Sequence, residues 1–119
     1  MKRLLALSLA TMIAAAAHAE PAEPPAVADL LAGVAELGRV NGTALACGYK
    51  ELLPKAKAMM LLRAPKTRRF GEAYEHASSD AFRAQTAGNQ PCPEQVILAL
   101  RLEAADLKLQ DAAKRAGVQ

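Results

Sequence analysis

Apolar residues recur every three or four positions through most of the chain, which is the spacing of one face of an α-helix. Proline and glycine divide this pattern into four segments, and it predicts helices over about 27–48, 51–64, 68–87 and 93–116. No segment alternates apolar and polar residues as a half-buried strand does. The prediction is therefore an all-α protein, a small four-helix bundle formed by a single domain over residues 27–119.

Glycine, proline and threonine mark the expected helix ends. The first helix is expected to end at Gly48, Gly88 is expected to stop the third in the left-handed conformation, and Pro65 ends the second. Thr67 can cap the start of the third helix, and Pro93 fits the first position of the fourth.

The last helix carries two apolar stripes. The stripes are Val96, Ile97, Leu100, Ala104 and Leu107, and Leu98, Leu102, Ala105, Leu109, Ala112 and Ala116. The simplest interpretation is a central helix that is buried on two sides. The alternative is that one stripe meets a partner or a second copy of the chain, which would make the protein a weak homodimer rather than a monomer.

Two glycines in the first helix predict a close helix crossing. Gly38 and Gly42 are four residues apart, so both lie on one helix face and leave it without bulk. Each glycine costs about 1 kcal/mol of helix stability relative to alanine, which suggests that close packing is required there. Asn41 lies beside them, where its amide can fix the register of the crossing or line a small cleft.

The first residues have the features of a signal peptide. Lys2 and Arg3 precede an apolar run over residues 4–17, and small residues at Ala17 and Ala19 fit cleavage after Ala19. The run is too short to span a membrane, and we find no other long apolar segment, so no transmembrane segment is expected after cleavage. We predict a signal peptide over residues 1–19, a disordered tether over 20–26, and a periplasmic location.

The predicted cleavage lowers the net charge of the chain, and the predicted export places its two cysteines in an oxidising compartment. The chain from residue 20 has 13 basic and 12 acidic residues, so its net charge is +1 rather than +3. Cys47 and Cys92 are an even pair in a chain sent to an oxidising compartment, where a disulfide is the expected state. Free thiols and an intermolecular bridge are the alternatives.

Basic residues concentrate around the turn between the second and third predicted helices. Residues 50–69 contain seven basic side chains against one acidic side chain. We take four of them as the candidate anion-binding or partner-binding surface, with help from Lys55 and Lys57: Arg63, Lys66, Arg68 and Arg69. The partner would be an anionic envelope component or an acidic protein. Nucleic acid is disfavoured, because interleaved aromatic residues and DNA-binding motifs are lacking.

Candidate catalytic and metal-binding residues are few. His76 lies four residues from both Glu72 and Asp80, so the three form either a pH-sensitive group or a plain surface ladder. No nucleophile has a recognisable motif spacing, and one histidine with two paired cysteines makes no zinc site. The sequence therefore predicts no enzyme, no cofactor and no metal.

Three stretches carry a resemblance to short exported helical proteins of proteobacteria. They are residues 37–48, the run from Arg63 to Gly71, and Cys92-Pro93. The resemblance implies export and a helical fold but no activity. The two cysteines and the small helical domain are also similar to HdeA-type periplasmic acid chaperones. We therefore expect a non-enzymatic periplasmic binding protein, with a stress or acid-activated chaperone as the alternative.

Overall fold

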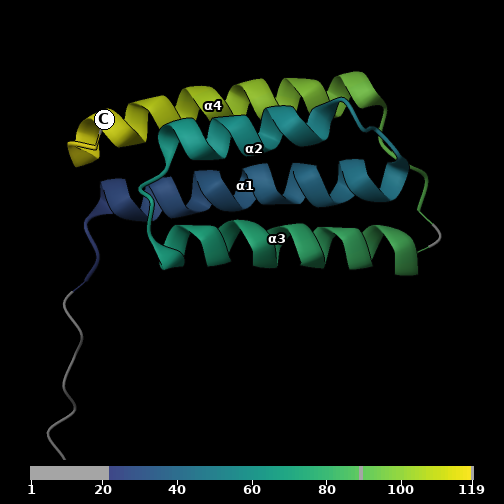
Figure 1. Ribbon diagram of the computed structural model, residues 1–119, viewed down its shortest axis with the longest axis horizontal. Coiled ribbons are helices and arrows are strands. Elements are labelled where there is room, and N and C mark those ends of the chain that lie inside the picture. The colour runs from purple at the N-terminus through teal and green to yellow at the C-terminus, as the bar shows by residue number, and fades with distance from the viewer. Residues whose placement is uncertain (1–21, 89, 119) are drawn as a thin grey trace, which may run out of the picture.

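The computed structural model describes residues 22–88 and 90–118, which form an all-α four-helix bundle with one disulfide, as predicted (Figure 1). The helices are α1 (Pro25–Cys47), α2 (Leu52–Arg63), α3 (Arg68–Ala87) and α4 (Gln95–Ala116). Consecutive helices run in opposite directions. The predicted signal peptide and the first residues of the tether lie outside the described residues.

Helix α1 begins two residues earlier than expected and ends as predicted. Pro25 is tolerated in the first turn because the backbone N–H groups there have no intrahelical partner, so residues 25 and 26 are helical rather than tether. At the other end Gly48 is left-handed, with φ 75°, and its N–H closes the last turn.

Two predicted helix ends were wrong in detail. Gly88 is extended, with φ −90° and ψ 140°, rather than left-handed, because the chain leaves the end of α3 to reach the disulfide at Cys92. Helix α4 begins at Gln95, two residues after Pro93. The Pro93 carbonyl accepts a hydrogen bond from the Tyr49 hydroxyl, and the next residue, Glu94, is extended.

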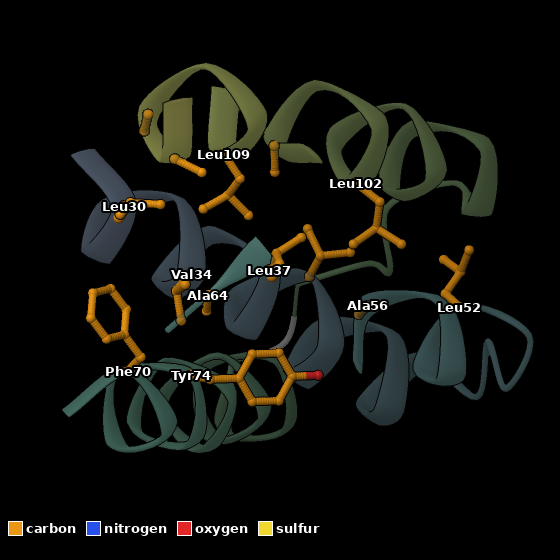
Figure 2. Close-up of a cluster of buried hydrophobic side chains, with 14 of the residues drawn as sticks. Leu30, Val34, Leu37, Leu52, Ala56, Ala64, Phe70, Tyr74, Leu102 and Leu109 are labelled. Atoms are coloured by element: carbon orange, nitrogen blue, oxygen red, sulfur yellow. The ribbon is translucent and has the colours of Figure 1, made fainter. Parts of the chain in front are cut away.

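Helix α1 is the centre of the bundle and packs against all three other helices. In Figure 1 it lies between α3 on one side and α2 and α4 on the other. Figure 2 shows the core around it, in which leucine and valine side chains of α1 and α4 are fully buried. The largest of them are Leu30, Val34, Leu37 and Val40 of α1 and Leu98, Leu102 and Leu109 of α4.

The two-sided burial expected for α4 was wrong. The stripe that starts at Leu98 is buried, but the large members of the other stripe are exposed to solvent. We call these residues the α4 outer face: Val96, Ile97, Leu100 and Leu107. The expectation failed because α1, not α4, is the central helix.

Within residues 22–88 and 90–118, no helix has both the length and the apolar character needed to cross a membrane.

Candidate functional site

The four predicted anion-binding residues lie at the α2–α3 turn, but two of them already donate hydrogen bonds to carboxylates. Arg63, at the end of α2, donates to both carboxylate oxygens of Asp106 on α4, with Nε–Oδ1 2.8 Å and Nη2–Oδ2 3.2 Å. This hydrogen-bonded pair lowers the pKa of Asp106. The guanidinium of Arg63 therefore ties α2 to α4 and is not fully available to a ligand.

Arg69 is engaged in a similar way. Both of its terminal nitrogens donate to the carboxylate of Glu23, which precedes α1, with Nη2–Oε2 2.5 Å. Arg68 is 89% exposed and makes only a 3.9 Å contact with Glu72, and Lys66 is also exposed. The basic turn thus contains two structural arginines and two side chains that face solvent.

A cleft next to this turn brings further residues to Lys66. It has a volume of about 590 Å³ and lies between the end of α2, the turn, and the last turns of α4. We call it the corner cleft; its lining includes Leu61, Leu62, Arg63, Lys66 and Lys114. Leu61 and Leu62 are 54% and 75% exposed, so apolar and cationic side chains share one open surface.

The residues predicted to allow close packing lie where α1 crosses α3. A Cβ atom on Gly38 would lie 2.4 Å from the Tyr74 carbonyl oxygen, and one on Gly42 would lie 2.0 Å from that of Ser78. The Asn41 Nδ2 atom donates to Ser78 Oγ at 2.7 Å. This partly buried hydrogen bond, of a kind worth about 1 kcal/mol, joins α1 to α3 at one register.

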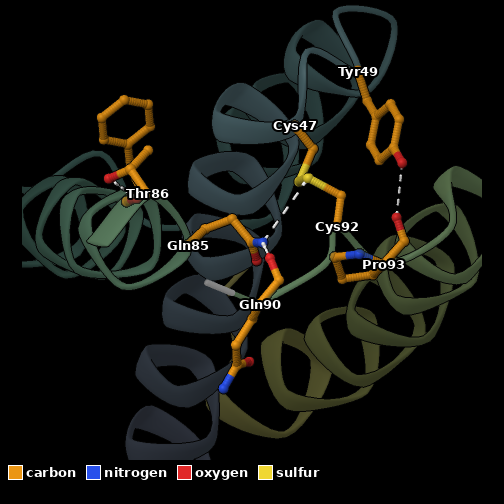
Figure 3. Close-up of a disulfide and its surroundings, with 8 residues drawn as sticks. Cys47, Tyr49, Gln85, Thr86, Gln90, Cys92 and Pro93 are labelled. Atoms are coloured by element: carbon orange, nitrogen blue, oxygen red, sulfur yellow. Dashed lines mark hydrogen bonds between the residues drawn. A yellow bond between two sulfur atoms is a disulfide. The ribbon is translucent and has the colours of Figure 1, made fainter. Parts of the chain in front are cut away.

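The disulfide joins the last residue of α1 to the segment before α4 (Figure 3). Cys47 and Cys92 are bonded, with their Cα atoms 5.8 Å apart, which confirms the predicted pairing. The Tyr49 hydroxyl donates to the Pro93 carbonyl at 2.8 Å beside it. The end of α1 and the start of α4 are therefore held together by a covalent bond and a hydrogen bond.

His76 is exposed on α3, and its two acidic neighbours pair with arginines of their own helix. Glu72 lies 3.9 Å from Arg68, and Asp80 accepts a hydrogen bond from Arg83 at 2.5 Å. Whether His76 responds to pH stays a hypothesis. In the part of the chain that the structure describes, no cluster of three or more His, Cys, Asp and Glu side chains could hold a metal ion.

Sequence reasoning missed three kinds of residue at these sites. Asp106, far along the chain from Arg63, gave no local signal. Lys114 and the exposed leucines of α2 join the basic turn only through the packing of α2 on α4. Ser78 could have been found, because it follows Tyr74 by four residues on the inner face of α3.

Compared with models of protein families, curated proteins and solved structures, the chain shows no match to any of them.

Proposed function

We propose that this protein is a non-enzymatic periplasmic binding protein that docks on anionic phospholipid surfaces of the envelope through the corner cleft. The observation that carries the proposal is the shared exposure of Leu61, Leu62, Lys66 and Lys114 around one cleft. Each feature alone is ordinary on a protein surface. Together, the exposed lysines and leucines are complementary to an amphiphilic anion, whose phosphate would contact lysine and whose acyl chain would contact leucine.

The ion pairs of the basic turn decide which residues test this proposal. Arg63 and Arg69 hold α4 and the segment before α1, so their removal would disturb packing as well as charge. Lys66 and Lys114 are exposed, and no side-chain hydrogen bond or ion pair holds them among the described residues. They can be changed with little effect on the fold.

We expect Lys66→Gln/Lys114→Gln to weaken binding to vesicles that contain anionic phospholipid by about tenfold or more, because each cation near such a surface contributes about 1 kcal/mol. Leu61→Ser/Leu62→Ser should weaken it as well. Co-sedimentation with anionic and with neutral vesicles at several salt concentrations measures the effect. The matched control is Lys50→Gln/Arg83→Gln, which removes the same charge from elsewhere on the surface.

Three results would count against lipid docking. Equal binding to neutral and anionic vesicles would exclude a role for the cations. An equal loss of binding in the control variant would show that only the net charge of the protein matters. Binding to polyglutamate but not to vesicles would identify an acidic protein as the partner.

An acid-activated chaperone is the second candidate, and the ion pairs of α4 favour it. Arg101 of α4 donates to Glu36 of α1, Nη2–Oε1 2.6 Å, and Arg63 of α2 holds Asp106. Partial burial alone would raise the pKa of Glu36, but hydrogen bonds from Arg101 and Arg39 outweigh it and the pKa is lowered. Both acids therefore bind protons less readily when the protein is folded.

Stability is therefore expected to fall in acid. A lowered folded pKa stabilises the fold above the ordinary values of 4.5 for Glu36 and 3.8 for Asp106, and this contribution is lost as the pH falls through the folded pKa. We expect the free energy of unfolding to decrease between about pH 5 and pH 2, with a shallower slope in Asp106→Asn. Urea unfolding at each pH measures this.

The chaperone role needs one further result. Acid should increase dye binding to exposed apolar surface and protect a client protein from aggregation. Acid destabilisation without client protection would leave the ion pairs as structural elements only.

A further inference from the structure

The α4 outer face is an apolar surface that the proposed lipid docking does not use. Its four side chains are between 47% and 67% exposed, although a single exposed leucine would need no explanation. Three of them, with Ala104, follow a three-four-three spacing along α4. We call this row the seam: Ile97, Leu100, Ala104 and Leu107. Such a row is the contact line of a two-helix coiled coil.

Charged residues of opposite sign flank the seam. At about 100° per residue, Glu103 lies on one side of the row, and Lys108 lies on the other. Arg101, on the same side as Lys108, is already held by Glu36. Among the described residues, neither Glu103 nor Lys108 takes part in an ion pair or a side-chain hydrogen bond, and both are exposed.

We propose that a second copy of this chain covers the α4 outer face, so that two α4 helices pack in parallel about a two-fold axis. In a parallel pair, a residue just before one seam position faces the residue five places later on the other helix. Glu103 of each copy then faces Lys108 of the other. The symmetry forms this ion pair twice, so the surface is complementary to itself.

The antiparallel arrangement does not match these charges. If the same four residues were paired antiparallel, the two-fold axis would pass near residue 102, and residues next to it would face their own copies. Glu103 would then meet Glu103, and Arg101 would meet Arg101. Like charges in contact oppose this arrangement within the seam, whereas the pairs of Glu103 with Lys108 favour the parallel one.

A groove beside the seam leaves room for side chains of the second copy. It has a volume of about 810 Å³ between α1 and α4, and its lining includes Gly33, Glu36, Ala104, Leu107 and Lys108. It lies on the Lys108 side of the seam, where Glu103 of the second copy arrives. The seam spans about 15 Å of helix, so the interface is short and the dimer is expected to be weak.

The parallel arrangement has a consequence for lipid docking. Both α4 helices would end on the same side of the dimer, so the two corner clefts would lie at the same end of it, where both could contact one membrane. Two weak contacts on one surface bind more tightly than either contact alone. This consequence rests on the proposed function, but the dimer does not.

The first test is the concentration dependence of molar mass. The full chain, expressed with its own N-terminal segment and purified after export, is followed by sedimentation equilibrium up to about 1 mM, the range of a weak dimer. We expect the wild type to dimerise and Leu107→Glu to stay monomeric with unchanged helicity, because Leu107 is 67% exposed. Leu62→Glu, 75% exposed on α2, is the matched control and should dimerise as the wild type does.

The second test uses charge reversal and reads the orientation. Glu103→Lys and Lys108→Glu should each weaken the dimer about tenfold, since two surface ion pairs become repulsive together. An equimolar mixture of the two variants should recover the wild-type affinity as a heterodimer, because both cross-pairs are again opposite in charge. Labelling one variant with ¹⁵N separates the masses of the two chains, so that native mass spectrometry distinguishes the heterodimer from both homodimers.

Each remaining outcome overturns the proposal. A wild type that stays monomeric over the whole range, or a dimer that Leu107→Glu leaves intact, shows that no second copy covers this face. Loss of dimer without recovery in the mixture rejects the parallel pair. A monomer whose vesicle binding depends on Leu107 identifies a lipid surface as the occupant instead.

Discussion

Replacing Gly42 with alanine is expected to lower the free energy of unfolding by about 2–3 kcal/mol. The new Cβ atom would lie 2.0 Å from the carbonyl oxygen of Ser78 and 2.9 Å from the amide nitrogen of Phe82. Both are backbone atoms of α3, so no side chain can rotate away, and α1 and α3 must move apart. Alanine by itself would favour the helix by about 1 kcal/mol relative to glycine, so only the clash with α3 makes the substitution destabilising.

Two other glycines provide graded controls for this prediction. A Cβ atom on Gly71, in α3, would meet nothing within 4 Å, so Gly71→Ala should leave stability unchanged or raise it by up to about 1 kcal/mol. The three atoms nearest to a Cβ atom on Gly33 would all belong to the side chain of Leu109, which can shift, so its replacement should have an intermediate effect.

Urea unfolding followed by circular dichroism gives the three values on one scale, provided that the slope with denaturant stays constant. Equal stability of Gly42→Ala and Gly71→Ala would show that α1 and α3 do not make this close contact.

Local sequence signals predicted the helices well because they act through the backbone of the same few residues. Pro65 stops α2 because it has no N–H to donate and disfavours helical geometry at the residue before it. Ala64 accordingly has an extended backbone. Gly48 ends α1 because a left-handed residue there carries no penalty. These effects need no knowledge of the partner helix.

The pairing of helices could not be predicted in the same way. The spacing of Gly38 and Gly42 predicted a flat face, but nothing local indicated that α3 rather than α4 would lie against it. Gly33, on another side of α1, lies against Leu109 of α4, so α1 accepts a neighbour on each side. That arrangement makes α1 central and leaves the α4 outer face uncovered within one chain.

The same limit applies to the charges. The count of basic residues between Lys50 and Arg69 predicted an open cationic surface. Arg63 and Arg69 instead meet Asp106 and Glu23, which are 43 and 46 residues away along the chain. Partners at such separations become visible only after the helices are packed, so the sequence overstated the charge that a ligand could reach.

Removing the disulfide is expected to have the largest effect on stability, about 4 kcal/mol for Cys47→Ala/Cys92→Ala. The bond joins residues 45 positions apart, and α2 and α3 lie entirely within the closed loop. In the chain-entropy model, closing this loop removes part of the conformational entropy of the unfolded chain, and the loss increases with the length of the loop. The free energy of unfolding of a small domain is about 5–15 kcal/mol in total, so a large share of its stability depends on this bond.

Guanidinium unfolding of three samples measures the contribution of the bond. The samples are the oxidised wild type, the wild type under reducing conditions, and the double alanine variant. The reduced wild type and the double alanine variant should have the same free energy of unfolding, because both lack the covalent link. Both should unfold at a lower denaturant concentration than the oxidised wild type. Disagreement between them would mean that the alanine side chains, not the loss of the bond, cause part of the change.

Tyr49→Phe separates the covalent link from the other contact at the same junction. It removes the hydrogen bond to the Pro93 carbonyl and keeps the disulfide, so we expect a loss of about 1 kcal/mol. The double alanine variant should lose several times more. If its loss were no greater than that of Tyr49→Phe, packing of α1 against α4 would already hold the two helix ends together, and the disulfide would contribute little to the stability of the fold.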